Sequence, residues 1–243
     1  MDIAFRYLML IAQVMHYGKK IRKTGRKNLE MEYKMMSLRW CPAPESSTGS
    51  AKRTDNVTGC APSVPGTRRL HIGGTVEKQG WEVLNAVSGP HVDHMGNAAD
   101  LSMFADETFS EIYSSNVLEH FDYVNEVPGV LKEWHRVLNN KGLLYVSVPD
   151  MDRLCELFLM KDALSLQESF HVMRMIFGGH TDQYDYHAVG LNLEFLVSYL
   201  TEAGFTRCRN VSGFGMFGDT SDLTFHNIPI SVNIVCEKEK TGR

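Results

Sequence analysis

The sequence predicts an α/β fold with a doubly wound, mostly parallel sheet, and residues 111–149 carry most of the signal. This stretch reads as a strand (111–115), an amphipathic segment and a second strand (143–148). Apolar residues in the middle segment recur at the spacing of one helix face. They are Val127, Val130, Leu131, Trp134, Val137 and Leu138. The second strand is apolar on both sides, as in a parallel strand covered on both faces. Together the three elements predict a right-handed crossover unit.

The ends of this unit also carry signals. Pro128 suits the first turn of the helix, where its missing N–H costs nothing, and Gly142 is expected to end the helix in a left-handed conformation. Ligands of open parallel sheets bind beyond the carboxyl ends of the strands. Residues 114–120 and 147–150 are therefore expected to border the site.

Bulk composition limits the class of protein. With 243 residues, 43% hydrophobic and 22% charged, the chain is long enough for one α/β domain with additions. The net charge of -4 gives no basic surplus for a nucleic acid partner. The five cysteines are scattered and form no C-x-x-C pair, so we expect reduced thiols in a cytoplasmic protein and no zinc site.

The chain is expected to divide into three parts. Residues 1–40 form an N-terminal helical and basic extension, whose apolar part is shorter than the roughly 20 residues that span a bilayer. No stable membrane insertion is expected; a leading helix that docks on the domain or is poorly ordered is favoured over attachment to a membrane surface. Residues 41–67 are rich in Pro, Gly, Ser and Thr and read as a linker. The folded domain then occupies residues 68–240.

The remaining elements of the domain follow from local patterns. Strands are expected at 68–72, 81–85, 206–211 and 230–236, and helices at 153–160 and 166–177. Asn192 should cap a further helix that buries Leu193, Leu196, Tyr199 and Leu200 and ends at Gly204. Residues 91–99 show no clear pattern. Residues 151–190, with their two helices and a polar loop, form a helical insertion.

Five short motifs, taken in order, resemble those of the class I S-adenosylmethionine-dependent methyltransferases of the type 11 branch. The motifs are Leu70-His-Ile-Gly-Gly74, Ala99-Asp-Leu101, Ser115-Asn-Val-Leu-Glu-His120, Glu133-Trp-His-Arg-Val-Leu138 and Leu144-Tyr-Val-Ser-Val-Pro149. The resemblance covers residues 68–238 and implies a Rossmann-like sheet that closes with a C-terminal antiparallel hairpin. It also implies that S-adenosyl-L-methionine is the cofactor.

The resemblance implies a set of cofactor-binding residues. The first motif departs from the family pattern at two positions: His71 replaces an acidic residue, and Thr75 replaces a glycine. The Gly73-Gly74 turn would let backbone approach the cofactor. Asn85 would bind the ribose, Asp100 would accept from the adenine amino group, and Leu101 would pack on the ring. Asn116 would lie beside the methionine part. The implied residues are His71, Gly73, Gly74, Asn85, Asp100, Leu101 and Asn116.

For a hydroxyl acceptor a general base is useful, and His120 is the first candidate, with His187 the second. The spacing of the nearby histidines and acids suits no defined ligand set, so no metal is expected. We expect a small-molecule or sugar hydroxyl acceptor, since relatives of this branch often modify sugars, with the insertion as the acceptor cover. Two other interpretations stay open. One is a noncatalytic, methyltransferase-like binding or scaffold protein; the other is a nicotinamide-dependent oxidoreductase, which is disfavoured because the G-x-G-x-x-G fingerprint is incomplete.

Overall fold

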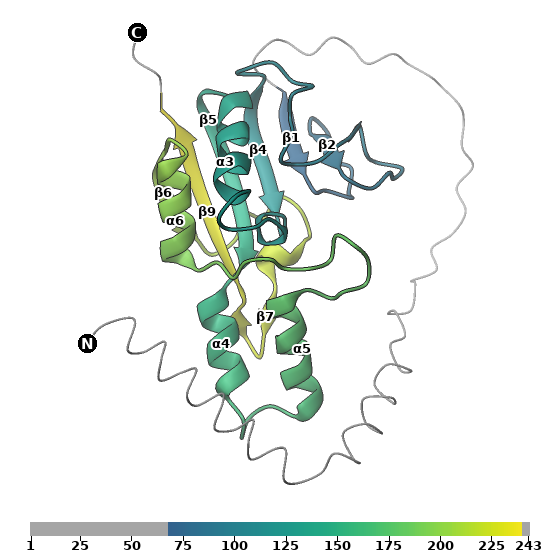
Figure 1. Cartoon of the computed structure of the whole chain (residues 1–243), viewed down its shortest axis with the longest axis vertical. Helices are drawn as coiled ribbons and strands as arrows, with labels where there is room; N and C mark the ends of the chain where they lie inside the picture. The colour runs from purple at the N-terminus through teal and green to yellow at the C-terminus, as the bar shows by residue number, and fades with distance from the viewer. Residues whose placement is uncertain (1–67, 240–243) are drawn as a thin grey trace. The chain divides into compact units, whose positions relative to one another are not determined.

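A computed structural model describes residues 68–239. The expected N-terminal extension (1–40) and linker (41–67) lie outside the described residues. Figure 1 shows a central sheet with helices α3 and α6 in front of it and helices α4 and α5 beyond one end of its strands. No helix among residues 68–239 is long and apolar enough to cross a bilayer.

The central sheet has seven strands in the order β3-β2-β1-β4-β5-β9-β6. The first five strands of that order run parallel, and β9 runs antiparallel to both β5 and β6. This is the expected Rossmann-like, mostly parallel sheet with a C-terminal antiparallel hairpin. The strands are β1 (Arg69–Ile72), β2 (Glu82–Asn85), β3 (His94–Met95), β4 (Phe109–Ser115), β5 (Leu138–Pro149), β6 (Phe205–Val211) and β9 (Ser231–Lys238).

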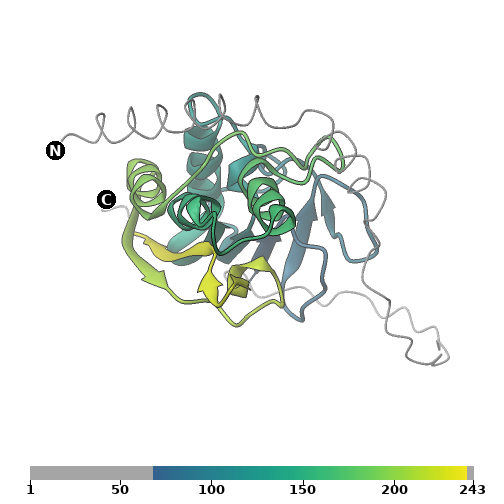
Figure 2. The ribbon, with the colours of Figure 1, turned by 90° about the horizontal axis from the view of Figure 1, so that it is seen from below.

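One face of the sheet packs against α3 (Val127–Val137) and α6 (Leu193–Glu202). Figure 2 shows these two helices on the same side of the sheet. The main core between them contains alternate side chains of the strands, such as Ile72, Ile112 and Val146, together with Trp134 of α3. Trp134 is fully buried, and its indole N–H donates to the carbonyl of Ala98 at 2.8 Å, so this large side chain leaves no unpaired donor.

Helix α3 confirms the expected crossover unit but ends differently. Pro128 lies in its first turn, as predicted. The expectation that Gly142 ends the helix in a left-handed conformation is wrong. Leu138 is already extended, and the residue with positive φ is Lys141, at 63°. Gly142 is needed for space instead, because a Cβ there would lie 2.7 Å from the Leu138 side chain and 2.8 Å from the Asn139 carbonyl oxygen.

The opposite face of the sheet has no helix between β1 and β2, which are joined by residues 73–81 alone. A parallel pair usually needs a crossover of a dozen or more residues. Here the second face is covered by the loop of residues 212–222, whose Phe217 packs with Trp81 and Tyr113 in a separate apolar cluster. The Tyr113 hydroxyl donates to Asp219 at 2.6 Å. Loop and strand are therefore joined by both apolar and polar contacts.

The helical insertion is present as predicted, with α4 (Met151–Leu159) and α5 (Leu166–Phe177). Asp150 caps α4, and Ser165 and Glu168 form a capping box on α5. The two helices share a small core with the hairpin of β7 (Thr224–Phe225) and β8 (Ile228–Pro229). This hairpin was not predicted.

Helix α6 begins and ends where the sequence indicates. The Asn192 side chain accepts from the Phe195 N–H at 2.9 Å, and Gly204 has φ 100°. Leu196 and Leu200 are fully buried, whereas Leu193 is 38% exposed. The expectation that Leu193 is buried is therefore wrong: its spacing from Leu196 and Leu200 is that of one helix face, but it is the first residue of α6 and is partly exposed there.

Candidate functional site

The glycine turn, Asn85 and Asn116 lie at one edge of the sheet, because β2, β1 and β4 are parallel neighbours and all three residues follow or end a strand. Gly73 has φ 78°, which is costly for any residue with a Cβ. A Cβ on Gly73 would overlap Val117 Cγ2. The turn after β1 is therefore in close contact with the segment that follows β4.

Asn85 holds the glycine turn rather than pointing freely to solvent. Its Nδ2 donates to the Gly74 carbonyl at 2.9 Å, and its Oδ1 accepts from the Val87 N–H at 2.9 Å. The Gly73 N–H donates to the Leu84 carbonyl at 2.8 Å. To bind a ribose hydroxyl as expected, the Asn85 side chain would have to give up these hydrogen bonds. The Gly73 N–H is likewise already paired within the fold.

Asn116 lies after β4 with φ 53°, and its backbone N–H donates to the Ser147 carbonyl at 3.0 Å. Its side-chain oxygen is buried and has no hydrogen-bond partner among the described residues. Unpaired buried polar atoms are costly and call for an explanation, such as a bound ligand. Asn116 is therefore the sequence-predicted cofactor residue with the clearest unused acceptor.

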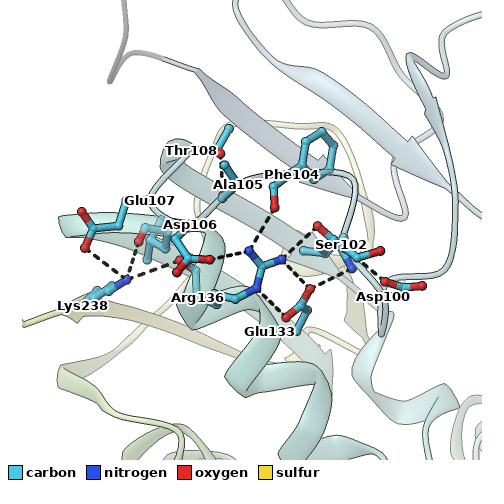
Figure 3. A network of polar contacts seen from close by, with 12 residues as sticks. Asp100, Ser102, Phe104, Ala105, Asp106, Glu107, Thr108, Glu133, Arg136 and Lys238 are labelled. Carbon is cyan, nitrogen blue, oxygen red and sulfur yellow. Dashed lines mark hydrogen bonds and ion pairs between the residues drawn. The ribbon is translucent and has the colours of Figure 1, made fainter.

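Asp100 and Leu101 lie in the segment between β3 and β4, which Arg136 of α3 fastens to the domain (Figure 3). The Arg136 guanidinium donates to both Glu133 oxygens at 2.8 and 2.6 Å and to the Leu101 carbonyl at 3.0 Å. Asp100 is exposed, and its hydrogen bonds from Ser102 lower the pKa of its carboxyl. The Leu101 side chain has no exposed surface, so in this conformation it belongs to the core and offers nothing to an adenine ring.

His71 is buried beneath the glycine turn. It is 5% exposed, and its ring packs on Tyr113 and Phe217 at centroid distances of 5.0 and 4.1 Å. A Cβ on Gly74 would lie 2.5 Å from the ring. Burial lowers the pKa of His71 to about 4, with Asp219 raising it and Lys78 lowering it further. His71 is therefore a neutral support of the turn and presents little surface to a ligand.

A second group of polar side chains gathers at the short helix η1 (Leu118–His120). Glu119 is 1% exposed, and neither carboxylate oxygen has a hydrogen-bond partner among the described residues. Burial raises the pKa of Glu119 to about 8. Sequence reasoning missed this residue, because a single acid next to His120 gives no signal of burial.

The loop of residues 178–190 brings His187 to the same place. The Ala188 N–H donates to the Glu119 carbonyl at 2.7 Å, and the His187 and His120 rings lie 5.1 Å apart. Burial lowers the pKa of His187, and the nearby His120 lowers it further. The two candidate bases, distant in the sequence, are therefore neighbours in the fold.

A small cavity of about 10 Å³ lies beside this group. That volume is close to what a single water molecule needs. The residues around it come from η1, β5, α4, α5 and the returning loop. They are Glu119, Pro149, Met151, Leu154, Met175, Ile176, His187, Val189 and Gly190. The cavity joins the carboxyl edge of the sheet to the helical insertion.

Comparison with known families bears on this arrangement. Residues 79–146 match the type 11 family described as "Methyltransferase domain". This stretch of the chain is similar to the type 11 methyltransferase family. The match includes Asn85, Asp100, Leu101, Asn116 and His120 and begins after the glycine turn. The match confirms the resemblance that the motifs indicated.

Several solved structures are similar to this chain. The CurJ carbon methyltransferase has 17% identity and a TM-score of 0.42, with 74% of this chain and 50% of that chain covered. A SAM-dependent methyltransferase from Methanosarcina mazei has 19% identity and a TM-score of 0.45, with 72% and 94% covered. The plantazolicin methyltransferase BamL, in complex with a triazolic desmethylPZN analog and SAH, has 14% identity and a TM-score of 0.47, with 72% and 77% covered. The assignment rests on the family match and not on these scores.

The chain spans half the length of the CurJ carbon methyltransferase structure and 63% of a structure described as a possible exported protein from Bordetella parapertussis. No curated protein matches the sequence.

The residues present fit S-adenosylmethionine in part. The positive φ of Gly73 and the unpaired oxygen of Asn116 suit a ligand at the carboxyl edge. Asp100 is exposed and its pKa is lowered, so its carboxylate can accept a hydrogen bond from an amino group. Asn85 fits only if it exchanges its bond to Gly74 for a ribose hydroxyl.

Proposed function

We propose that the protein is an S-adenosylmethionine-dependent methyltransferase that acts on a small-molecule or sugar hydroxyl. The observation that carries the proposal is the contact between Gly73 and Val117. Val117 immediately precedes η1, so the glycine turn at the cofactor edge is continuous with the segment that holds Glu119 and His120. A methyl donor bound at the Gly73-Gly74 turn and an acceptor bound next to the helical insertion would meet near Val117.

The cofactor supplies a methyl group on a sulfonium, which is already a strong electrophile. The chain therefore contributes mainly by holding donor and acceptor in line, which can be worth about 7 to 11 kcal/mol. Asn116 and the Gly73-Gly74 turn hold the cofactor, with Asp100 at the far end. A general base adds about 10²- to 10⁴-fold. Alignment is the larger contribution.

His120 is the base in this proposal. Its Nδ1 lies 3.0 Å from the Tyr186 carbonyl oxygen, and because a carbonyl only accepts, Nδ1 carries the ring proton. Nε2 is then free to receive the proton of an acceptor hydroxyl. His187 is held in the same way through the Ile176 carbonyl at 3.2 Å and is the second candidate. The insertion of residues 151–190 covers this side and serves as the acceptor cover.

Calorimetry with S-adenosylhomocysteine tests the cofactor part of the proposal. We expect binding by the full chain, weakened by Asn116→Ala and unaffected by Asn97→Ala, which alters a neighbouring surface loop. No heat and no thermal shift at millimolar ligand would refute cofactor binding. If Thr75→Gly then created binding that the natural protein lacks, the noncatalytic binding or scaffold protein would be the correct interpretation.

Transfer from methyl-labelled cofactor to a panel of sugars and small alcohols tests the acceptor part. The expected outcome is labelled ether product, with the rate lowered by His120→Gln while the affinity for S-adenosylhomocysteine is kept. Label found only on amines, thiols or carbon acceptors would overturn the hydroxyl assignment and leave the methyltransferase assignment intact.

A further inference from the structure

Glu119 presents a problem that methyl transfer does not solve. Its carboxyl group is 1% exposed, and both oxygens lack hydrogen-bond partners among residues 68–239. Burying such a group without a partner costs several kcal/mol in general. A buried carboxyl group without a partner in the protein is often the binding site of a ligand. A cation suits such a group best, because both carboxylate oxygens can bind it.

The two histidines beside Glu119 are prepared for the same partner. His120 Nδ1 lies 3.0 Å from the Tyr186 carbonyl oxygen, and His187 Nδ1 lies 3.2 Å from the Ile176 carbonyl oxygen. Both Nδ1 atoms must then carry the proton, which leaves a lone pair on each Nε2. Metal-binding histidines typically donate their second ring N–H to a carbonyl or carboxylate in this manner, which fixes tautomer and orientation.

The three side chains also come close enough to share one ion. One ligand atom from each of Glu119, His120 and His187 lies within 4.8 Å of the other two. Ligand atoms about 2.1 Å from a tetrahedral ion lie about 3.4 Å apart. Binding therefore requires the side chains to close by on the order of 1 Å, a rotamer adjustment. The adjoining cavity of about 10 Å³ leaves room for one further small ligand, such as water.

We propose that Glu119, His120 and His187 bind a divalent transition-metal cation of the zinc type, with an open coordination position toward the cavity. Two imidazoles and one carboxylate are a ligand set that Zn²⁺ uses when it keeps a fourth position for water or substrate. Harder cations such as Mg²⁺ prefer oxygen ligands and are disfavoured. This proposal revises the expectation, drawn from sequence spacing, that these residues form no metal site.

The cation site does not depend on cofactor binding, but it changes the chemistry available there. A bound ion takes up the lone pair of His120 Nε2, so His120 cannot then act as a free base. An acceptor hydroxyl at the open position is acidified by the ion instead. The helical insertion, which carries the loop with His187, would also be fastened to η1 through the ion.

Metal titration of the full chain tests the proposal without the methyl donor, so its outcome is separate from that of the proposed function. Protein stripped with a chelator is titrated with Zn²⁺ by calorimetry, and with Co²⁺ to record visible absorption. We expect one site, a higher Tm with metal, and Co²⁺ bands typical of four-coordinate nitrogen and oxygen ligation. Glu119→Gln, His120→Gln and His187→Gln should each weaken binding by at least about tenfold.

Matched controls separate this site from the other histidines. His180→Gln removes an exposed histidine on the same loop, and His226→Gln removes one that pairs with Glu168 on the surface. Both should keep the zinc affinity. Glu119→Gln should be about as stable as the metal-free natural protein, because the glutamine has a similar shape and the raised pKa of about 8 keeps the natural acid largely neutral at pH 7. This variant therefore reports on binding even if a histidine variant does not fold.

Absence of binding at millimolar Zn²⁺ would overturn the proposal. So would stoichiometric binding that survives all three Gln variants, because the ion would then be held elsewhere. Loss of binding in the control variants, with the site variants unaffected, would assign the ion to the surface histidines and likewise overturn it.

Discussion

The side-chain amide of Asn85 donates to the carbonyl oxygen of Gly74 at 2.9 Å, which joins the end of β2 to the turn after β1. This bond decides how a change toward the family's acidic residue would behave. A carboxylate cannot donate, and it would face a carbonyl oxygen at the same distance.

Asn85→Asp is therefore expected to weaken the turn and not to improve cofactor binding. The lost hydrogen bond and the unpaired carbonyl should lower the free energy of unfolding by about 1 to 2 kcal/mol. Urea denaturation measures this, and calorimetry with S-adenosylhomocysteine should show no gain in affinity. Asn97→Asp is the control, because Asn97 uses only its oxygen, toward the Ala99 N–H, and an aspartate can replace it. A tighter complex of Asn85→Asp would show that Asn85 turns to the ligand.

Gly73→Ala is expected to destabilise the domain for two separable reasons. The left-handed conformation costs a residue with a Cβ about 1 to 2 kcal/mol, and the new methyl group would meet Val117 Cγ2. Adding Val117→Ala should restore only the part due to the contact. Gly129→Ala is the opposite control, since Gly129 lies in α3 with nothing within 4 Å of an added Cβ; it should stabilise by about 0.5 to 1 kcal/mol. Equal Tm values for both single variants would contradict the described turn.

The burial of His71 predicts a loss of stability in mild acid. Its pKa is about 4 in the folded protein and near 6.5 when unfolded, so the unfolded state binds the proton more readily between these values. Stability should thus be complete above about pH 6.5 and fall as the pH decreases toward 4. The contribution of this one group is at most about 3 kcal/mol.

His71→Phe should reduce the dependence of the free energy of unfolding on pH between pH 4 and 6.5. The pH dependence that comes from carboxylates should remain. Urea midpoints measured between pH 4 and 7 provide the test, because the slope is informative even if absolute stability changes. His91→Phe, at an exposed position, should keep the slope of the natural protein. An unchanged slope in the His71 variant would mean that the buried imidazole is not the group that titrates.

Arg136→Lys should destabilise although it keeps the charge. A lysine cannot reproduce the paired contacts with Glu133, and the carbonyls of Leu101 and Phe104 would lose a donor. We expect a loss of about 1 to 3 kcal/mol in urea denaturation. Arg153→Lys, which pairs with Glu156 at an exposed i,i+3 position, should change stability by less than about 0.5 kcal/mol. Equal losses in both variants would indicate a simple charge effect.

The elements with a clear hydrophobic periodicity could be predicted from sequence, because the burial of one apolar face determines them. Val127, Trp134 and Val137 place a stripe on one helix face, and the same stripe is buried in α3. The caps of α6 at Asn192 and Gly204 were predictable because their roles depend on a few local atoms. Strand β3 was not, because two residues give no period, and neither was the short hairpin β7–β8.

The candidate site could be predicted only in pieces. Gly73, Asn85 and Asn116 follow strand ends, so the topology alone brings them to one edge. The meeting of His120 with His187 depends on how the loop after α5 returns to η1, through the Ala188 to Glu119 hydrogen bond. The burial of Glu119 results from that return as well. No local pattern encodes it, which is why a cluster with ligand geometry was not expected from spacing.

The position of β9 between β5 and β6 has a consequence for synthesis. A nascent chain that has emerged as far as β6 cannot yet complete the sheet, because the strand that joins β6 to β5 is residues 231–238. Until those residues leave the ribosome, β5 keeps an unpaired edge. The sheet is therefore completed only after residues 231–238 have emerged, and until then the open edge of β5 is available for pairing with another strand.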